Sequence, residues 1–426
     1  MRILILTRNA WDDTNSIGNT VSNFFRDISD AEYANIYFRS AKPNNRLCEK
    51  YYRVTEKEVL KNWLSPSKIG RSFEFKADSV DCSAGSSSDF GEKKIISLAH
   101  KYNLRFLNTL SDRIWDSKKW INGNLDAFIR SFAPDLVFTF VKALPQYYQT
   151  IRLLREKYHI PLLTWIADDE YTGYLNGGKK KQIDRLRYII SESTVVTGCS
   201  QEICDYYNSV FGCAATPLYK GCDLSAPVKD KTNDPLCVVY AGNLLFGRLE
   251  IIRKISDALE NYVDSGGRRI SFEIYSNTPL SDTDISAYFG GNSCTAFKGS
   301  ESYTVIKKRL SQADIVLHAE SFDDAEIIKT RYSFSTKIID YLQSGSVILA
   351  VGPGEISSIK YIRKIPGAYV IDDIDSIKDM LPILLNDLDS FPERAAKTRE
   401  FALKNHDSKS LAGDLNRLLM KTALYK

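Results

Sequence analysis

Short apolar, β-branched runs alternate with amphipathic stretches along most of the chain. In the first half, the apolar runs predict strands over residues 2–7, 35–38, 135–141, 161–166 and 194–198. An apolar period of about 3.6 residues predicts helices over residues 19–28, 144–158, 181–191 and 200–211. This alternation is typical of βα units built on a parallel sheet.

The same order recurs in the second half of the chain. Strands are expected over residues 237–241, 271–275, 314–318 and 347–351. Helices are expected over residues 249–263, 303–312 and 336–344. We therefore expect an α/β protein with two tandem, doubly wound, Rossmann-like domains.

A polar segment separates the two halves. Residues 224–234 contain a proline and lack an apolar period, and a new apolar strand follows directly. We expect an N-terminal domain over residues 1–224, a C-terminal domain over 236–405, and a helix over 406–426 that packs back on the first domain. The βα rhythm is lost over residues 41–91, which we interpret as an insertion.

Composition indicates a globular protein. The 426 residues are 43% hydrophobic and 26% charged, which excludes a disordered or fibrous chain. No stretch reaches the roughly 18 apolar residues that span a bilayer, and the short apolar start lacks a signal-peptide cleavage site. We expect a cytoplasmic protein, or one held peripherally at the inner face of a membrane.

The cysteines, the histidines and the net charge limit the kinds of ligand that the chain is expected to bind. The eight cysteines include no paired C-x-x-C motif and the four histidines no H-E-x-x-H motif, so no metal site is expected. Residues 1–225 contain 31 Lys and Arg against 26 Asp and Glu, a net charge of +5, and the remainder contains 26 against 27, a net charge of −1. This excess is too small to indicate nucleic acid, but it suits an anionic ligand or lipid surface.

The loop after the first predicted strand is a candidate binding site. Gly18 and Asn19 lie at the start of a predicted helix, whose free N–H groups can meet an anion or a sugar. The loop is not G-x-G-x-x-G, which disfavours a dinucleotide site. The alternative is an ordinary strand-to-helix turn capped by Asn15 or Ser16.

Two acids follow the strand predicted over residues 161–166. Asp168 and Asp169 are expected at the carboxyl end of that strand, where open α/β sheets place ligand-binding groups. Such carboxylates accept hydrogen bonds from sugar hydroxyls or serve as a general base. The alternative is an acidic helix cap.

A glycine and a cation follow the first strand of the second half. Gly242 ends the strand, and Arg248 stands at the entrance of the next predicted helix. Loop amides and a guanidinium together suit a diphosphate. The alternative is a surface arginine.

The richest segment runs from residue 318 to residue 353. Ser335 and Thr336 are expected to cap a helix, and Lys337 lies in its first turn, where its charge opposes the helix dipole. A bound anion relieves that conflict. Asp340 follows one turn later, and Glu320 ends the preceding strand. The alternative makes Lys337 a solvated charge and Asp340 an exposed helix residue.

These segments resemble a known family. Residues 340–345 followed by VILAVGP resemble the nucleotide-sugar-binding signature of retaining glycosyltransferases of the glycosyltransferase-B fold, in the large family 4-like group related to bacterial polysaccharide enzymes. The KGCD motif at residues 220–223 is similar to that family's Asn-Gly-Val-Asp turn. Gly242 and Arg248 match a glycine and a basic residue at the family's spacing. Residues 297–321 are similar to the segment around the donor base and ribose.

The resemblance implies a donor substrate and roles for individual residues. The donor is a nucleotide-diphosphate sugar, with a UDP-sugar favoured, and neither a cofactor nor a metal is required. The implied catalytic residues are Arg248, Lys337, Asp168 and Asp169. The implied donor-binding residues are Gly242, Asn243, Glu320, Ser335, Thr336 and Asp340. The implied acceptor-binding residues are Gly18 and Asn19.

The resemblance also implies a partner and a setting. The acceptor is a glycan, a lipid-linked group or a protein, and the pathway is surface polysaccharide or glycoconjugate biosynthesis. Basic, aromatic clusters over residues 50–76 and 100–120 fit an anionic membrane surface. Solvated helix faces over buried aromatic residues explain the same clusters.

Two departures from the family pattern keep other functions open. Asn243 stands where the family has an arginine, and Tyr332 stands where its E-x7-E motif has the first acid. One alternative is a non-catalytic glycosyltransferase-like subunit that binds an acceptor or a partner transferase. A second alternative is a nucleotide-sugar epimerase, which would need further acid and base groups.

Overall fold

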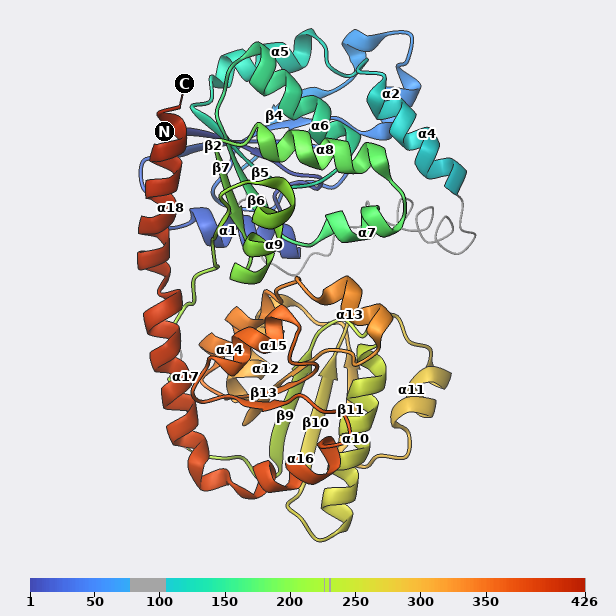
Figure 1. Cartoon of the computed structure of the whole chain (residues 1–426), viewed down its shortest axis with the longest axis vertical. Helices are drawn as coiled ribbons and strands as arrows, with labels where there is room; N and C mark the ends of the chain where they lie inside the picture. The colour runs from blue at the N-terminus through green and yellow to red at the C-terminus, as the bar shows by residue number, and fades with distance from the viewer. Residues whose placement is uncertain (77–104, 226, 230, 426) are drawn as a thin grey trace. The chain divides into compact units, whose positions relative to one another are not determined.

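The computed structural model describes residues 1–76, 105–225, 227–229 and 231–425. It divides into two compact units, and Figure 1 shows helices around a sheet in each of them. Unit 1 comprises Met1–Leu218 together with Ala412–Lys426, and unit 2 comprises Tyr219–Leu411.

Unit 1 contains an eight-stranded sheet with the order β4-β3-β2-β1-β5-β6-β7-β8. Every neighbouring pair is parallel except β3 and β4. The strands are β1 (Arg2–Leu6), β2 (Glu32–Tyr37), β3 (Lys50–Arg53), β4 (Arg71–Glu74), β5 (Leu136–Phe140), β6 (Leu162–Ile166), β7 (Val195–Gly198) and β8 (Thr216–Pro217).

Helices connect these strands. The described ones are α1 (Ser16–Phe25), α2 (Glu56–Lys61), α4 (Arg105–Asp116), α5 (Gly123–Phe132), α6 (Pro145–Arg152), α7 (Glu170–Asn176), α8 (Lys180–Ser191) and α9 (Gln201–Phe211). A π-helical turn, Leu153–Lys157, continues α6. The last helix, α18 (Ser408–Ala423), returns to unit 1 from Ala412 onward.

The core of unit 1 explains why its central strands form. Every residue of β5 and β6 is buried, as is every residue of β1 after Arg2. Burying each large aliphatic or aromatic side chain contributes about 1.5–3 kcal/mol. Strands buried on both faces show continuous apolar runs, which is why the sequence predicts them.

The segment expected as an insertion belongs partly to the sheet. Strand β3 pairs parallel with β2, and β4 pairs antiparallel with β3, so this part of the chain extends the sheet at one edge. Both strands are short and carry charged residues, and in β3 only Tyr51 and Tyr52 are buried. The sequence does not predict β3 and β4 because each contains too few apolar residues to form a recognisable strand pattern. Residues 77–91 of the expected insertion lie outside the described residues.

Unit 2 contains a six-stranded parallel sheet with the order β11-β10-β9-β12-β13-β14. The strands are β9 (Leu236–Ala241), β10 (Ile270–Tyr275), β11 (Thr295–Gly299), β12 (Ile315–Ala319), β13 (Val347–Val351) and β14 (Tyr369–Ile371). The helices are α10 (Arg248–Asp264), α11 (Asp282–Phe289), α12 (Tyr303–Gln312), α13 (Asp324–Thr330), α14 (Lys337–Ser344), α15 (Ser357–Arg363), α16 (Ile377–Asn386) and α17 (Phe391–His406).

The strand order of each unit reverses near its centre. The reversal lies between β1 and β5 in unit 1 and between β9 and β12 in unit 2. In open parallel sheets, ligands bind outside the carboxyl ends of the strands at this switch point. The loops that follow these four strands are therefore the places where binding residues are expected.

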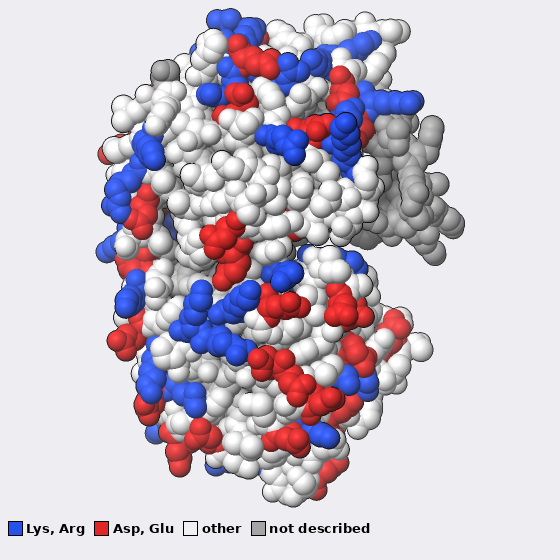
Figure 2. Space-filling model, in the orientation of Figure 1, with Lys and Arg blue, Asp and Glu red and all other residues white. Residues whose placement is uncertain are grey.

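Three further features concern surface charge, membrane-spanning helices and metal ligands. Figure 2 shows basic and acidic side chains intermixed on the visible face of each unit. Among the residues that the structure describes, no helix combines the length and apolar character needed to cross a bilayer. The same residues contain no cluster of three or more His, Cys, Asp or Glu side chains arranged to hold a metal ion.

Candidate functional site

Polar side chains converge at the switch point of unit 2. Gly242 follows β9 and Glu320 follows β12, and these strands are neighbours in the sheet. Arg248 opens α10 after a turn in which Gly247 has a φ of 71°. A side chain larger than that of glycine is strained at this φ, and a Cβ at position 247 would also lie 2.4 Å from the Ser321 hydroxyl. The turn therefore depends on glycine to bring Arg248 to this edge.

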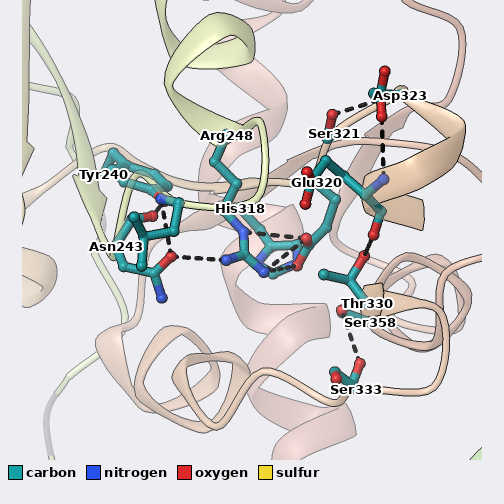
Figure 3. A network of polar contacts seen from close by, with 12 residues as sticks. Tyr240, Asn243, Arg248, His318, Glu320, Ser321, Asp323, Thr330, Ser333 and Ser358 are labelled. Carbon is teal, nitrogen blue, oxygen red and sulfur yellow. Dashed lines mark hydrogen bonds and ion pairs between the residues drawn. The ribbon is translucent and has the colours of Figure 1, made fainter. Parts of the chain in front are cut away.

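Arg248 and Glu320 form a bidentate ion pair. The guanidinium Nε and Nη2 atoms lie 3.1 and 2.8 Å from Oε2 of Glu320, and Nη2 lies 3.1 Å from Oε1. A third donor, Nη1, reaches Oδ1 of Asn243 at 2.9 Å. Figure 3 shows Arg248 between these two partners. The side chains of Arg248 and Glu320 are only 14% and 3% exposed, so the pair is well shielded and its geometry is fixed.

His318 adds a second contact to the same carboxylate. It lies two residues before Glu320 on β12, and its Nε2 atom is 3.3 Å from Oε1 of Glu320. Burial raises the pKa of the Glu320 carboxyl, but His318 and Arg248 outweigh that effect and hold its pKa below the usual range. Glu320 is therefore a carboxylate at neutral pH.

Lys337 supplies a cation without a counter-ion. It is partly buried at the first position of α14, and within the described ranges its ammonium makes no hydrogen bond or ion pair. Burial, together with the charge of Arg248, lowers its pKa to about 8. An anion bound here would compensate a charge that the protein leaves unpaired.

Gly242 makes room for that ammonium. A Cβ at position 242 would lie 2.8 Å from Nζ of Lys337 and 2.6 Å from the hydroxyl of Tyr240. The Tyr240 hydroxyl is itself fixed, because it donates to the carbonyl oxygen of Asn243 at 2.6 Å. Glycine at this position is thus required for the approach of Lys337 to the β9 loop.

The expected cap of α14 is absent. Thr336 occupies the N-cap position with helical φ and ψ of −60° and −15°, and it makes no side-chain cap hydrogen bond. The prediction that Ser335 and Thr336 cap this helix through their side chains is therefore wrong for Thr336. Its backbone is already helical, whereas a capping side chain needs an extended residue at that position.

Asp340 lies one turn after Lys337. Its Oδ1 atom accepts hydrogen bonds from the Tyr303 hydroxyl at 2.8 Å and from Nε2 of Gln343 at 3.2 Å. Burial raises the pKa of the Asp340 carboxyl, and the nearby charge of Lys220 opposes the shift. Asp340 is therefore a partly buried acid with partners, rather than an exposed helix residue.

The KGCD turn packs against the same helices. Asp223 accepts a 3.0 Å contact from Nζ of Lys307 on α12, and its backbone amide donates to Oε1 of Gln343 on α14 at 3.1 Å. Hydrogen bonds from Ser225 and Lys307 lower the pKa of Asp223 to about 2. The turn thus joins the loop before unit 2's sheet to the elements that carry Asp340.

Sequence reasoning missed four members of this group. His318, Tyr303, Lys307 and the role of Lys220 were not predicted as parts of a site. His318 lies within an apolar strand and the others lie on a helix or turn, so nothing in local spacing distinguishes them. Their position inside the 297–321 and 220–223 segments was the one available signal.

In unit 1, Gly18 lies in the capped first turn of α1. Asn15 is the N-cap of α1 and its side chain accepts the Gly18 amide at 2.8 Å. The Asn19 amide donates to the carbonyl oxygen of Asn15 at 2.9 Å. A Cβ at position 18 would lie 2.0 Å from the carbonyl oxygen of Asp12, so close backbone packing accounts for this glycine.

The two acids after β6 have different surroundings. Asp168 is exposed, with Oδ2 3.7 Å from Nζ of Lys142. Asp169 is the N-cap of α7 and accepts the Thr172 amide at 3.2 Å. Burial raises the pKa of Asp169. Both acids lie at the carboxyl edge of the sheet, and the capping role predicted as an alternative is observed for Asp169.

Comparisons with known proteins extend this description. No family model and no curated protein matches the chain. Solved structures match over its whole length. Sucrose-phosphate synthase from Thermosynechococcus elongatus is 10% identical, with 100% of both chains covered and a TM-score of 0.64. Trehalose-6-phosphate synthase, OtsA, is 10% identical, with 99% of both chains covered and a TM-score of 0.65.

A third match holds a nucleotide. Anabaena Alr3699/HepE, in complex with UDP, is 11% identical, with 99% of this chain and 100% of that chain covered and a TM-score of 0.60. At such low identity these matches establish architecture. They confirm the predicted fold class: two Rossmann-like α/β units in the arrangement of strands and helices that is the glycosyltransferase-B fold.

Proposed function

We propose that this protein is a retaining glycosyltransferase. It moves a hexosyl or related sugar from a nucleotide-diphosphate sugar, with a UDP-sugar favoured, to a glycan, lipid-linked or protein-linked acceptor. The observation that carries the proposal is the unpaired Lys337 ammonium beside Gly242 at the switch point of unit 2. A cation held there without a counter-ion suits a diphosphate.

The residues of unit 2 then have distinct roles. As the bond between the sugar and the diphosphate oxygen breaks, its electron pair stays on that oxygen and negative charge builds on the β-phosphate. Lys337 donates to this charge, and Arg248 contributes the N–H groups that Glu320 and Asn243 leave unused. Preorganised cations of this kind are usually the largest catalytic contribution. The backbone amides at Ser335 and Thr336 assist them.

The nucleoside is expected beside Asp340, one turn after Lys337 on α14. Asp340 accepts ribose hydroxyls in this proposal, in competition with its present hydrogen bond from Tyr303. Glu320 acts through Arg248, because its carboxylate oxygens are already engaged. Acceptor binding is assigned to unit 1, with Asp168 and Asp169 as candidate acid or base groups and Gly18 and Asn19 at the start of α1.

Related structures support the class of donor. Anabaena Alr3699/HepE has been solved with UDP and glucose and with UDP-glucose, and an E. coli trehalose-6-phosphate structure holds UDP-2-fluoro glucose. WaaG, another match, is a glycosyltransferase involved in lipopolysaccharide biosynthesis. We extend these properties to a role in surface polysaccharide or glycoconjugate assembly, in the cytoplasm or at the inner face of a membrane.

One observation favours a second candidate function. Nε, Nη1 and Nη2 of Arg248 all donate within the protein, and Asn243 occupies the place where the resembled family has an arginine. A non-catalytic subunit that binds an acceptor or a partner transferase needs no free cations for a donor. The two functions differ in whether the protein binds a nucleotide.

Isothermal titration calorimetry with UDP, GDP and ADP tests the proposal. We expect micromolar binding of one nucleotide, weakened about ten- to a hundredfold in Lys337→Ala and Arg248→Ala, because each charge-assisted contact contributes roughly 1.5–3 kcal/mol. Lys329→Ala, which removes an exposed lysine from α13, is the matched control. Absence of binding by folded wild-type protein favours the non-catalytic subunit.

A further inference from the structure

A row of basic residues follows three neighbouring strands of unit 1. Strands β2, β1 and β5 are adjacent and parallel. The second residue past the end of each strand is basic: Arg39 after β2, Arg8 after β1 and Lys142 after β5. Because neighbouring strands lie about 4.8 Å apart and run in register, these residues start side by side at one edge of the sheet.

Backbone hydrogen bonds fix the first two of these positions. The Thr7 amide donates to the Ile36 carbonyl at 3.1 Å, and the Phe38 amide donates to the Arg8 carbonyl at 3.0 Å. The buried Asn35 side chain ties the same strands together by donating to the Thr7 hydroxyl at 2.8 Å. Arg8 and Arg39 therefore extend from a rigid part of the fold rather than from a long loop.

Among the residues that the structure describes, acids pair with only one of these three cations. Nζ of Lys142 lies 2.8 Å from Oε1 of Glu170 and 3.7 Å from Oδ2 of Asp168. In the part of the chain that the structure describes, neither the Arg8 nor the Arg39 guanidinium makes a hydrogen bond or an ion pair. Two guanidinium groups thus share one edge without an anion between them.

The acids that face this edge already have partners. Glu170 accepts the Ala143 amide at 3.1 Å as well as Lys142, and Glu56 at the start of α2 accepts the Ser111 hydroxyl at 2.9 Å. Both act on Arg8 only through longer-range attraction. Partial desolvation lowers the pKa of Arg8 most, and the like charge of Arg39 lowers it further.

The position of this pair points to a ligand. Arg8 follows β1 and Lys142 follows β5, and the strand order of unit 1 reverses between these two strands. This is where a doubly wound sheet binds its ligand. Arg8 is exposed and Arg39 is partly exposed, so both guanidinium groups are accessible.

We infer that Arg8 and Arg39 form a binding site for a phosphate group in unit 1. Phosphate matches the site better than carboxylate, because two guanidinium forks supply two charges and several N–H donors to a group with three accessible oxygens. The assignment of this phosphate to the sugar acceptor rests on the proposed function. The existence of the phosphate site does not depend on that function.

Titration of the full chain with inorganic phosphate tests the site. We expect Arg8→Gln and Arg39→Gln each to weaken phosphate binding by roughly tenfold or more. Arg187→Gln, which removes an exposed arginine from α8, changes the net charge equally and should leave binding unchanged. Failure of the wild-type protein to bind phosphate, or equal binding by all variants, would overturn the inference.

A second set of measurements distinguishes this phosphate site from the proposed nucleotide site in unit 2. Lys337→Ala should keep its affinity for inorganic phosphate, and both arginine variants should keep their affinity for UDP. Loss of phosphate binding in Lys337→Ala alone would assign the anion to unit 2 and overturn the inference. If no nucleotide binds to the wild-type protein, the proposed function fails while the phosphate titration still decides the role of Arg8 and Arg39.

Two probes distinguish the sources of the phosphate. Glucose 6-phosphate represents a soluble phosphorylated acceptor, and phosphatidylcholine vesicles with or without phosphatidic acid represent a lipid. Arginine-dependent binding of either probe supports the site and names its source. Binding of either probe that is unaffected by Arg8→Gln and Arg39→Gln would contradict it.

Discussion

The Arg248 guanidinium donates to both carboxylate oxygens of Glu320, with Nη2 2.8 Å from Oε2 and 3.1 Å from Oε1. These residues are 72 positions apart and meet because β9 and β12 are neighbours. The pair immobilises one cation of the site and compensates its charge. Lys337, which has no such partner among the described residues, is left to attract the diphosphate of the proposed donor.

Removing the Glu320 carboxylate should lower the free energy of unfolding, and bound UDP should restore part of that loss. Glu320→Ala leaves the shielded Arg248 charge uncompensated, and breaking such a pair costs about 3–5 kcal/mol of unfolding free energy. A bound UDP supplies a replacement anion, so its stabilising effect should be larger in the variant. Guanidinium denaturation with and without UDP measures both quantities. Glu250→Ala, from an exposed pair with Arg253, is the control, and an equal loss there would contradict the prediction.

Nucleotide binding should depend on the protonation of Lys337. The pKa of its ammonium in the free protein is about 8, so the cation is present below this pH and is lost above it. A diphosphate binds the protonated form, and the UDP association constant should therefore fall by about tenfold per pH unit once pH passes 8. Calorimetry across this range measures the slope. Lys337→Arg keeps its charge and should flatten the profile, whereas an unchanged slope in that variant would assign the pH dependence elsewhere.

Gly242→Ala should displace the Lys337 ammonium. The added Cβ would lie 2.8 Å from Nζ of Lys337, so we expect UDP affinity to fall by roughly tenfold. Calorimetry in a double-mutant cycle with Lys337→Ala should show little further loss, because both changes remove one contact. Gly291→Ala, where an added Cβ meets nothing within 4 Å, is the matched control. Additive losses would show that the glycine acts independently of Lys337.

Gly18→Ala should reduce stability through packing. Its Cβ would lie 2.0 Å from the Asp12 carbonyl oxygen, and overpacking of this kind costs about 1–3 kcal/mol. Chemical denaturation should show this loss, whereas Gly173→Ala, in open space on α7, should have no such cost. A stable Gly18→Ala protein would contradict the packing explanation.

Most of the fold could be predicted from the pattern of apolar residues, because that pattern reflects which strands are buried. Strands such as β5 and β6 are buried along their whole length, and their continuous apolar runs stand out in the sequence. Strand β3, which lies between β2 and β4, does not stand out in the sequence because two of its four residues are charged and exposed or partly exposed. Two adjacent buried residues between two charged ones give no alternating apolar signal.

The sequence predicts those site residues whose position follows from the local secondary structure. Lys337 and Arg248 stand at helix starts, a position that the sequence reveals. Their relations to Glu320 and Gly242 depend on tertiary packing. Arg8 and Arg39 were not recognised for the same reason: a basic residue after a strand gains meaning only when the neighbouring strand is known.

The two-part make-up of unit 1 has a consequence for biosynthesis. Its residues Ala412–Lys426 follow the whole of unit 2 in the chain, and Leu415 and Leu419 of this segment are buried. A ribosome therefore completes unit 2 before it delivers the last helix of unit 1. During translation, the apolar surface of unit 1 that contacts Leu415 and Leu419 therefore stays exposed to solvent until α18 has been synthesised and packs on it.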